Sequence, residues 1–284
     1  MKLMDCHTHT QFSVDSEADI DLCVSRAAEL GLAAYAITDH CECNCWYEKA
    51  HYPEDTWYLR ESFDYAADFE NSVSAVTALK EKYEGKLNLI CGVELGQILH
   101  DTEAAKIVNA DSRVDFIIGS VHQVMGELDF YFIEYEKMTM DEIYALLERY
   151  FKEVHEMSKN GFFDVVGHIT YCLRYMKQRH GIEADISRYD DIIAETFRNL
   201  AHNGKGIEIN TSGLRQGFGD CFPSLKYVKM FRDMGGEIIS FGSDSHTVED
   251  IGANIADGMR IARAAGFTRG AYFKKRSPYF IDIE

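Results

Sequence analysis

Seven short apolar runs recur along this chain, and longer stretches with helical periodicity separate them. This alternation predicts parallel strands joined by crossover helices. Seven repeats suit a closed or nearly closed barrel better than an open sheet, and the active site of such barrels lies at the C-terminal ends of the strands. The first run ends at Cys6-His7, and the others cover residues 34–38, 87–93, 114–119, 162–166, 206–209 and 236–241. Helices are predicted near residues 18–30, 63–83, 140–159, 188–202, 224–234 and 249–265, before a short final segment at 270–273.

Nine side chains that can bind metal ions follow these runs. They are His7, His9, Asp15, His40, Glu94, His122, His168, Asp244 and His246. Imidazoles and carboxylates are ligands of zinc, manganese and iron. Each residue alone has an ordinary explanation, such as a surface histidine or a helix cap. Together, at the same end of successive predicted strands, they indicate a multinuclear metal site.

The spacing of some of these residues adds detail. Side chains two positions apart on a strand share a face, so His7 and His9 can hold one ion. Asp15 lies in a segment that can fold back over the strand end. Glu94 ends a buried run, where a charge is costly unless it is paired or bound to metal, and a carboxylate can bridge two ions. Asp39 is either a carboxylate that orients His40 or a capping residue.

Two arginines follow later runs and are predicted to lie on the same rim. Arg174 comes six residues after His168, and Arg215 ends the stretch Ile209-Asn210-Thr211-Ser212-Gly213-Leu214. The planar guanidinium suits phosphate oxygens. The alternative for any single arginine is a solvated surface position, but their shared placement favours phosphate binding.

The segment after His40 is unusual in composition. Residues 41–62 are predicted to form an aromatic-rich loop, which is either a substrate lid or a small core that fixes a long loop. It contains Trp46, Tyr47, Tyr52, Trp57 and Tyr58. Cys41, Cys43 and Cys45 alternate at its start, without the C-x-x-C spacing of structural zinc sites. We expect ordinary loop thiols, with incidental metal binding as the alternative.

Length and charge restrict the remaining possibilities. The 284 residues carry a formal charge of −18 and only three prolines, and no linker divides them, so we expect one domain over residues 1–284. The negative charge disfavours long nucleic acids and anionic membranes. No apolar run reaches about 18 residues, the length of a membrane span. The eight scattered cysteines and the absence of a signal peptide favour a cytoplasmic protein with reduced thiols.

The order of these motifs resembles the PHP (polymerase and histidinol phosphatase) family of metal-dependent phosphoesterases. The matching motifs are H-x-H at 7–9, Asp15, T-D-H at 38–40, G-V-E at 92–94, S-V-H at 120–122, G-H at 167–168 and S-D-S-H at 243–246. The resemblance spans roughly residues 5 to 246 and implies a distorted (β/α)7 barrel. The aromatic insertion and the stretch that ends at Arg215 are most similar to the histidinol-phosphate phosphatases of that family.

The resemblance implies two to three divalent transition-metal ions, zinc, manganese or iron. The first would be held by His7, His9, Glu94 and Asp244, the second by Glu94, His122 and His168, and the third by Asp15, His40 and His246. Some family members have histidine where this chain has Asp15, so the resemblance leaves the occupancy of the third site open. It also implies catalytic roles for Glu94 and Asp244, and phosphate binding by Arg174 and Arg215.

The expected reaction is therefore hydrolysis of L-histidinol phosphate, a small phosphate ester, by a monomer or small homo-oligomer. Three alternatives stay open: another phosphoesterase of this family acting on nucleotides or other small esters, a noncatalytic metal-binding module that serves a partner, and a metal-dependent amidohydrolase. Many amidohydrolases bridge their metals with a carboxylated lysine that ends the fourth strand. Residues 116–122 of this chain contain no lysine.

Overall fold

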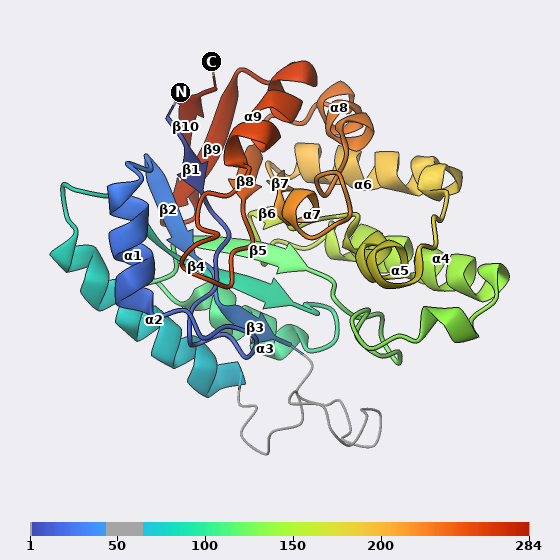
Figure 1. Cartoon of the computed structure of the whole chain (residues 1–284), viewed down its shortest axis with the longest axis horizontal. Coiled ribbons are helices and arrows are strands. Elements are labelled where there is room, and N and C mark those ends of the chain that lie inside the picture. Colours follow the sequence, from blue (N-terminus) through green and yellow to red (C-terminus); the bar gives the residue numbers. More distant parts are fainter. Residues whose placement is uncertain (1, 44–64, 284) are drawn as a thin grey trace.

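The computed structural model describes residues 2–43 and 65–283, and parallel strands form a nearly closed barrel in it (Figure 1). The path around the barrel is β1-β2-β4-β5-β6-β7-β8, and every neighbouring pair on it is parallel. The strands are Met4–Asp5 (β1), Ala34–Ile37 (β2), Leu89–Gly96 (β4), Phe116–Ser120 (β5), Val165–Val166 (β6), Gly206–Asn210 (β7) and Ile239–Gly242 (β8). The predicted distorted (β/α)7 barrel is confirmed.

The first and last barrel strands close the ring through backbone contacts just beyond their ends. The amide of Cys6 donates to the carbonyl of Phe241 over 2.8 Å, and the amide of His9 donates to that of Ser245 over 2.8 Å. The contact of Thr8 with Ser245 is a parallel bridge. The first and last strands of the barrel therefore meet at the site that the sequence predicts.

One additional strand corrects the prediction for the segment after His40. Strand β3 covers His40–Glu42 and pairs in parallel with β4, with His40 beside Glu94. Residues 41 and 42 are thus part of the barrel wall instead of the start of a loop. The predicted loop otherwise falls almost entirely outside the described residues, as do its tryptophans and tyrosines.

Helices surround the barrel (Figure 1). Their ends have clear local causes: the Asp19 side chain caps α1, and Thr139 and Glu142 form a capping box at the start of α4. The predicted helices are all present in the described part, and α3, α5 and α7 are additional. The bounds are Ile20–Glu29 (α1), Tyr65–Lys82 (α2), Thr102–Ala110 (α3), Met140–Met157 (α4), Arg174–His180 (α5), Asp190–His202 (α6), Ser212–Arg215 (α7), Leu225–Asp233 (α8) and Ile255–Ala264 (α9), with 3-10 turns at Tyr135–Lys137 (η3), Tyr171–Leu173 (η4) and Ile186–Tyr189 (η5).

A hairpin follows α9 and covers the end of the barrel opposite the predicted site. Its strands, Arg269–Lys274 (β9) and Ser277–Asp282 (β10), are antiparallel, so the expected short final segment is longer than predicted. Arg276 in the turn donates from Nε to Asp164 Oδ2 over 2.6 Å and from its amide to the carbonyl of Asp115 over 2.9 Å. Because both aspartates precede strands, the hairpin is fixed to the N-terminal end of the barrel.

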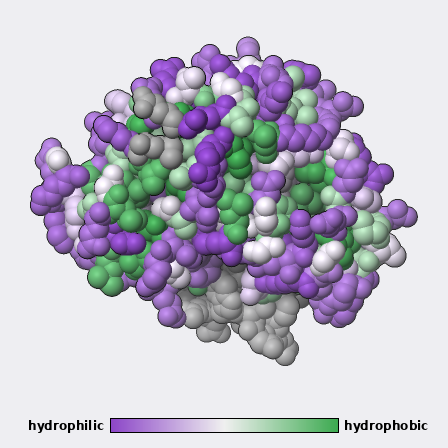
Figure 2. Space-filling model, turned by 45° about the horizontal axis from the view of Figure 1, so that its top comes forward, coloured by the Kyte–Doolittle hydropathy of each residue, from purple (hydrophilic) through white to green (hydrophobic). Residues whose placement is uncertain are grey.

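The core consists of the barrel strands and the inward faces of the helices. Residues of β2, β4, β5, β7 and β8 are buried throughout, as expected for parallel strands that are covered on both faces. Hydrophilic residues make up much of the surface shown in Figure 2, with smaller hydrophobic patches between them. Among the described helices, none is long and apolar enough to cross a membrane.

Candidate metal centre

All nine predicted ligand residues converge at the C-terminal end of the barrel. Their nitrogen and oxygen atoms form overlapping groups, in each of which the atoms lie within 4.8 Å of one another. The groups are His9-Asp15-His40-His246, His7-Glu94-His168, His7-His9-Asp244 and His40-Glu94-His122. The strand ends thus bring together side chains from positions 7 to 246, which is the arrangement of donors that a multinuclear metal site needs.

Glu94 lies at the centre of this cluster, and its two carboxylate oxygens face different imidazoles. Oε1 is 2.8 Å from His168 Nε2 and 3.1 Å from His122 Nε2. Oε2 is 3.1 Å from both His7 Nε2 and His40 Nδ1. The side chain is 1% exposed. Each oxygen can therefore serve a separate ion, which is the geometry of a bridging ligand.

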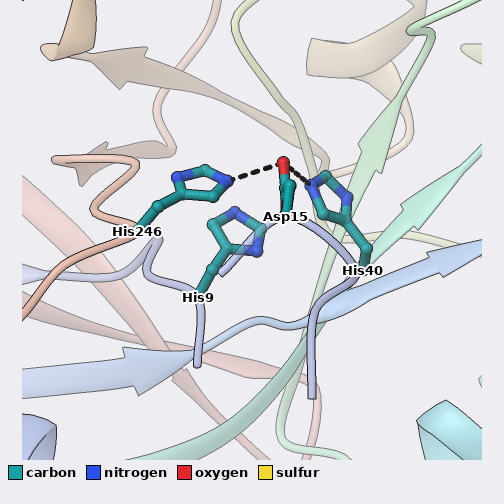
Figure 3. Close-up of side chains that lie close together, drawn as sticks. All are labelled: His9, Asp15, His40 and His246. Atoms are coloured by element: carbon teal, nitrogen blue, oxygen red, sulfur yellow. Dashed lines mark hydrogen bonds and ion pairs between the residues drawn. The ribbon is translucent and has the colours of Figure 1, made fainter. Parts of the chain in front are cut away.

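The outermost group is shown in Figure 3, where the Asp15 carboxylate lies between two imidazoles. Asp15 Oδ2 is 3.0 Å from His246 Nε2 and 3.6 Å from His40 Nε2. The ring of His9 is stacked on both, with centroid distances of 4.3 Å to His40 and 4.2 Å to His246. The segment that carries Asp15 folds back over the strand ends as predicted.

Asp244 connects the buried histidines to the rim. Its Oδ1 is 3.4 Å from His9 Nε2, and its amide donates to the carbonyl of His7 over 2.8 Å. Asp244 and His168 both adopt positive φ, 54° and 21°, which is uncommon for residues other than glycine. Such backbone conformations persist when surrounding contacts hold them, and they occur often at functional sites.

The imidazoles are oriented by partners that the sequence analysis did not identify. Glu208 on β7 accepts a hydrogen bond from His7 Nδ1 over 2.7 Å and another from the amide of His168 over 2.9 Å. Glu42 on β3 accepts from His122 Nδ1 over 3.1 Å. Since Nδ1 is the donor in both histidines, Nε2 is the atom that faces the cluster and can bind an ion.

Two glycines make room for these carboxylates. A Cβ atom on Gly242 would collide with Glu208 and His7, and one on Gly96 would collide with the Glu42 carboxylate. Both positions lie at strand ends within the site. A side chain at either position would displace the glutamate that orients a ligand histidine. Glycine is therefore the residue that fits at both positions.

The hydroxyl of Ser13 orients His9 in a similar way. It donates to Asp39 Oδ1 over 2.9 Å and accepts from His9 Nδ1 over 2.9 Å and from the amide of His40 over 3.0 Å. Asp39 also accepts from Thr10, so it fixes the loop that follows β1. The suggestion that Asp39 orients the ring of His40 is therefore wrong: it acts on His9 through Ser13.

Glu94 and His9 have the protonation states that metal ligands need, whereas nearby carboxylates outweigh burial and raise the pKa of His7 and His122, which must release a proton when an ion binds. Burial by itself raises the pKa of Glu94, but the charges of His7 and His122 outweigh it and hold the pKa well below its usual range. Burial and the charge of His246 lower the pKa of His9 to about 3. The carboxylate is thus ionised and His9 is neutral, as ligands must be.

Arg174 is the first residue of α5 and points toward the cluster. Its guanidinium lies over the rings of Tyr175 and Tyr171, 5.3 and 5.7 Å from their centroids. Nη1 is 3.5 Å from Asp244 Oδ2, and Nη2 donates to Gln216. Its buried Nε has no hydrogen-bond acceptor among the described residues. Arg174 therefore presents donor capacity beside the predicted metal ligands.

Arg215 at the end of α7 has a different environment. Nη1 donates to the carbonyl of Ser243 over 2.5 Å, Nη2 to that of Asp244 over 2.8 Å, and Nε to Asp250 over 3.0 Å. Three of the five guanidinium hydrogens are thus committed to protein acceptors. Arg215 therefore holds the main chain at Ser243 and Asp244 in place. Phosphate binding by Arg215 stays a prediction.

The cysteines near the site have no visible part in it. Cys41 and Cys43 are buried and not in disulfides, and Cys41 is a strand residue instead of the loop thiol that was expected. Burial raises the pKa of the Cys41 thiol well above its usual range, which disfavours the thiolate form that binds metals. No metal-binding group within the described ranges includes a cysteine. Cys45 lies outside those ranges.

Comparison with known protein families decides where this barrel belongs. Residues 5–212, most of the chain, match the model of the PHP domain. The chain belongs to the PHP domain family. The motifs that resemble the PHP family are therefore those of a family member. Asp244 and His246, which lie beyond residue 212, belong to the same metal-binding cluster.

Named relatives of this PHP protein match it over nearly their whole length. A probable histidinol-phosphatase of Clostridium acetobutylicum is 27% identical over 96% of this chain and 98% of the relative. One of Thermotoga maritima is 27% identical over 93% of each. The crystal structure of histidinol phosphate phosphatase from Lactococcus lactis, complexed with zinc, L-histidinol and phosphate, has a TM-score of 0.77. At 23% identity over 98% of this chain and 99% of that one, it shows the shared fold.

Proposed function

We propose that this PHP protein is a metal-dependent phosphomonoesterase that hydrolyses L-histidinol phosphate to L-histidinol and phosphate, as a step of histidine biosynthesis in the cytoplasm. The observation that carries the proposal is the convergence of nine metal-binding side chains beside Arg174. Full-length relatives named histidinol-phosphatases support this choice of substrate. Whether the protein acts as a monomer or a small homo-oligomer stays a prediction.

The donor set fits two to three zinc, manganese or iron ions. We assign His7, His9, Glu94 and Asp244 to the first ion, Glu94, His122 and His168 to the second, and Asp15, His40 and His246 to the third. The groups His7-His9-Asp244 and His9-Asp15-His40-His246 support the first and third assignments. The second finds support in the contacts of Glu94 Oε1 with His122 and His168.

Such ions, when bound, activate water and neutralise charge on a phosphoryl group. The protein's own residues supply the remaining functions. Glu94 sets the distance between the two inner positions through its two oxygens. Asp244 lies between His9 and Arg174 and can carry a proton exchanged with the attacking water. Arg174 can stabilise the negative charge of the phosphoryl oxygens by donating hydrogen bonds to them.

A substrate screen tests the proposed function. L-histidinol phosphate, AMP and several sugar phosphates should be compared at equal concentration with manganese or zinc present. We expect L-histidinol phosphate to have the highest kcat/KM. If AMP or another ester has the highest kcat/KM, that ester would replace L-histidinol phosphate as the proposed substrate. If none of the esters is hydrolysed, a noncatalytic metal-binding module would be favoured.

Removing the guanidinium of Arg174 should weaken both catalysis and the binding of inorganic phosphate. We expect Arg174→Ala to lower kcat/KM about 10- to 1,000-fold, the range for lost charged donors. Inorganic phosphate should also inhibit this variant more weakly than the wild type. Arg174→Lys should restore activity only in part, because an ammonium cannot form the planar fork.

Arg179→Ala is a matched control, since Arg179 lies on the same helix and stacks on the same Tyr175 but is exposed. It should keep wild-type kinetics. Arg215→Ala should lose metal or thermal stability in addition to activity, because Arg215 braces Asp244. Wild-type phosphate inhibition in both Arg174→Ala and Arg215→Ala would place phosphate binding elsewhere on the rim.

A further inference from the structure

One buried carboxylate near the metal centre takes no part in holding the predicted ligands. Asp129 is 8% exposed and lies at the end of a short turn that follows His122. An antiparallel bridge between Gln123 and Asp129 closes this turn, and the amide of Phe130 donates to the carbonyl of His122 over 3.0 Å. The position of Asp129 is therefore tied directly to a predicted metal ligand.

The contacts of Asp129 differ from those of the other buried acids at the site. Glu42 and Glu208 each accept a hydrogen bond from an imidazole. Asp129 Oδ1 accepts only the amide of Tyr131, over 2.7 Å, and Oδ2 accepts no hydrogen bond from the described residues. It also belongs to none of the metal-binding groups within those residues. A buried carboxylate with an unused oxygen is costly unless a cation or a donor approaches it.

The surroundings of Asp129 place it on the side of the site where Arg174 lies. The Arg174 guanidinium lies over the Tyr175 ring, 5.3 Å from its centroid, and the ring of Tyr131, two residues after Asp129, packs edge-on against the same ring with centroids 5.2 Å apart. The turn that carries Asp129 and the helix that carries Arg174 therefore pack against each other. A substrate whose phosphoryl group contacts Arg174 would thus lie on the side of the site where this turn is.

We infer that Asp129 binds the ammonium group of the substrate and so selects esters that carry an amine two carbons from the phosphoryl oxygen. This inference rests on the proposed function, because L-histidinol phosphate has such an amine. Only two carbons separate the amine from the phosphoryl oxygen, whereas the imidazole at the end of a longer branch extends further from the phosphoryl group. An ammonium group beside the carboxylate would favour its ionised form.

Two ester pairs test this inference in the metal-loaded protein. L-histidinol phosphate is compared with 3-(imidazol-4-yl)propyl phosphate, which lacks only the amine, and 2-aminoethyl phosphate is compared with ethyl phosphate. The variant Asp129→Asn keeps an oxygen for the Tyr131 amide but loses the charge. We expect it to lower kcat/KM for the aminated esters about 10- to 100-fold, with the amine-free esters changed less than about threefold.

Glu127→Gln is the matched control, because Glu127 lies in the same turn, is partly exposed and pairs with Arg149. It should keep the wild-type preference for amines. An equal loss on both members of each pair in Asp129→Asn would overturn the inference and make Asp129 a structural residue. An unchanged preference, or a wild type without one, would overturn it as well.

The design separates this inference from the proposed function. A wild type that ignores L-histidinol phosphate but prefers 2-aminoethyl phosphate through Asp129 would disprove the proposed alcohol and support the amine contact. Conversely, if the wild type and Asp129→Asn cleave L-histidinol phosphate equally well, the proposed function stands and the amine contact is contradicted.

Discussion

Replacing Glu94 with glutamine should reduce kcat by at least about 1,000-fold, the largest loss that we expect from a single substitution. The reason is the central position of Glu94, whose two oxygens face the His122-His168 and His7-His40 sides of the cluster. An amide retains one weak oxygen donor and turns a nitrogen toward the other side. Both inner ions would then lose a charged ligand that they share.

The matched variant is Asp15→Asn, which makes the same chemical change at the outer edge of the cluster. Asp15 contacts only His40 and His246 of the predicted ligands, and its side chain is 28% exposed. We expect a much smaller loss there. Rates at saturating manganese and metal content by elemental analysis should be measured for both. Similar mild losses in the two variants would argue against a bridging Glu94.

Removing the metal ions should abolish phosphatase activity and lower the melting temperature by about 5–15 °C. The purified protein should contain two to three transition-metal equivalents. Ions that bind only the folded chain stabilise it by several kcal/mol at concentrations far above their Kd, and a chain of this size converts each kcal/mol into about 2–4 °C. Without ions, the buried carboxylates and imidazoles of the cluster would be stabilised only by their contacts with one another.

The measurement uses a strong chelator, followed by gel filtration and re-addition of zinc, manganese or ferrous iron. Activity and melting temperature should recover together with the ion that restores the native site. Chelated Glu94→Gln should show a smaller shift in melting temperature than the chelated wild type. Full activity of thoroughly metal-free protein would refute the metal-dependent mechanism.

The strand-end residues could be predicted from sequence because their signal is local. An apolar run followed closely by histidine or a carboxylate identifies a strand and the region of its C-terminal end, as at His122 just after β5 and at Glu94, two residues before the end of β4. The closed barrel then determines that these ends meet. The same local signal is present at Glu208, a charge between two isoleucines in a buried run.

Other parts of the site depend on contacts between residues distant in the sequence. Nothing local to Glu42 distinguishes it from a loop glutamate, and its role appears only when β3 places it beside His122. Gln216 and Asp129 likewise lie near Arg174 and His122 through tertiary packing. Arg215 shows the converse: its type suggested an anion site, whereas the fold also uses it to hold backbone carbonyls.

The closure of the barrel by its first and last strands affects how the protein is made. Asp15 and His246, which share the outer group, are 231 positions apart. During synthesis the N-terminal residues leave the ribosome first, so His7 and His9 are made long before Asp244. Until β8 follows, β1 and β7 have exposed edges that can pair with other chains. Full metal loading therefore has to follow translation, and a chain interrupted before residue 244 would be a candidate for aggregation or degradation.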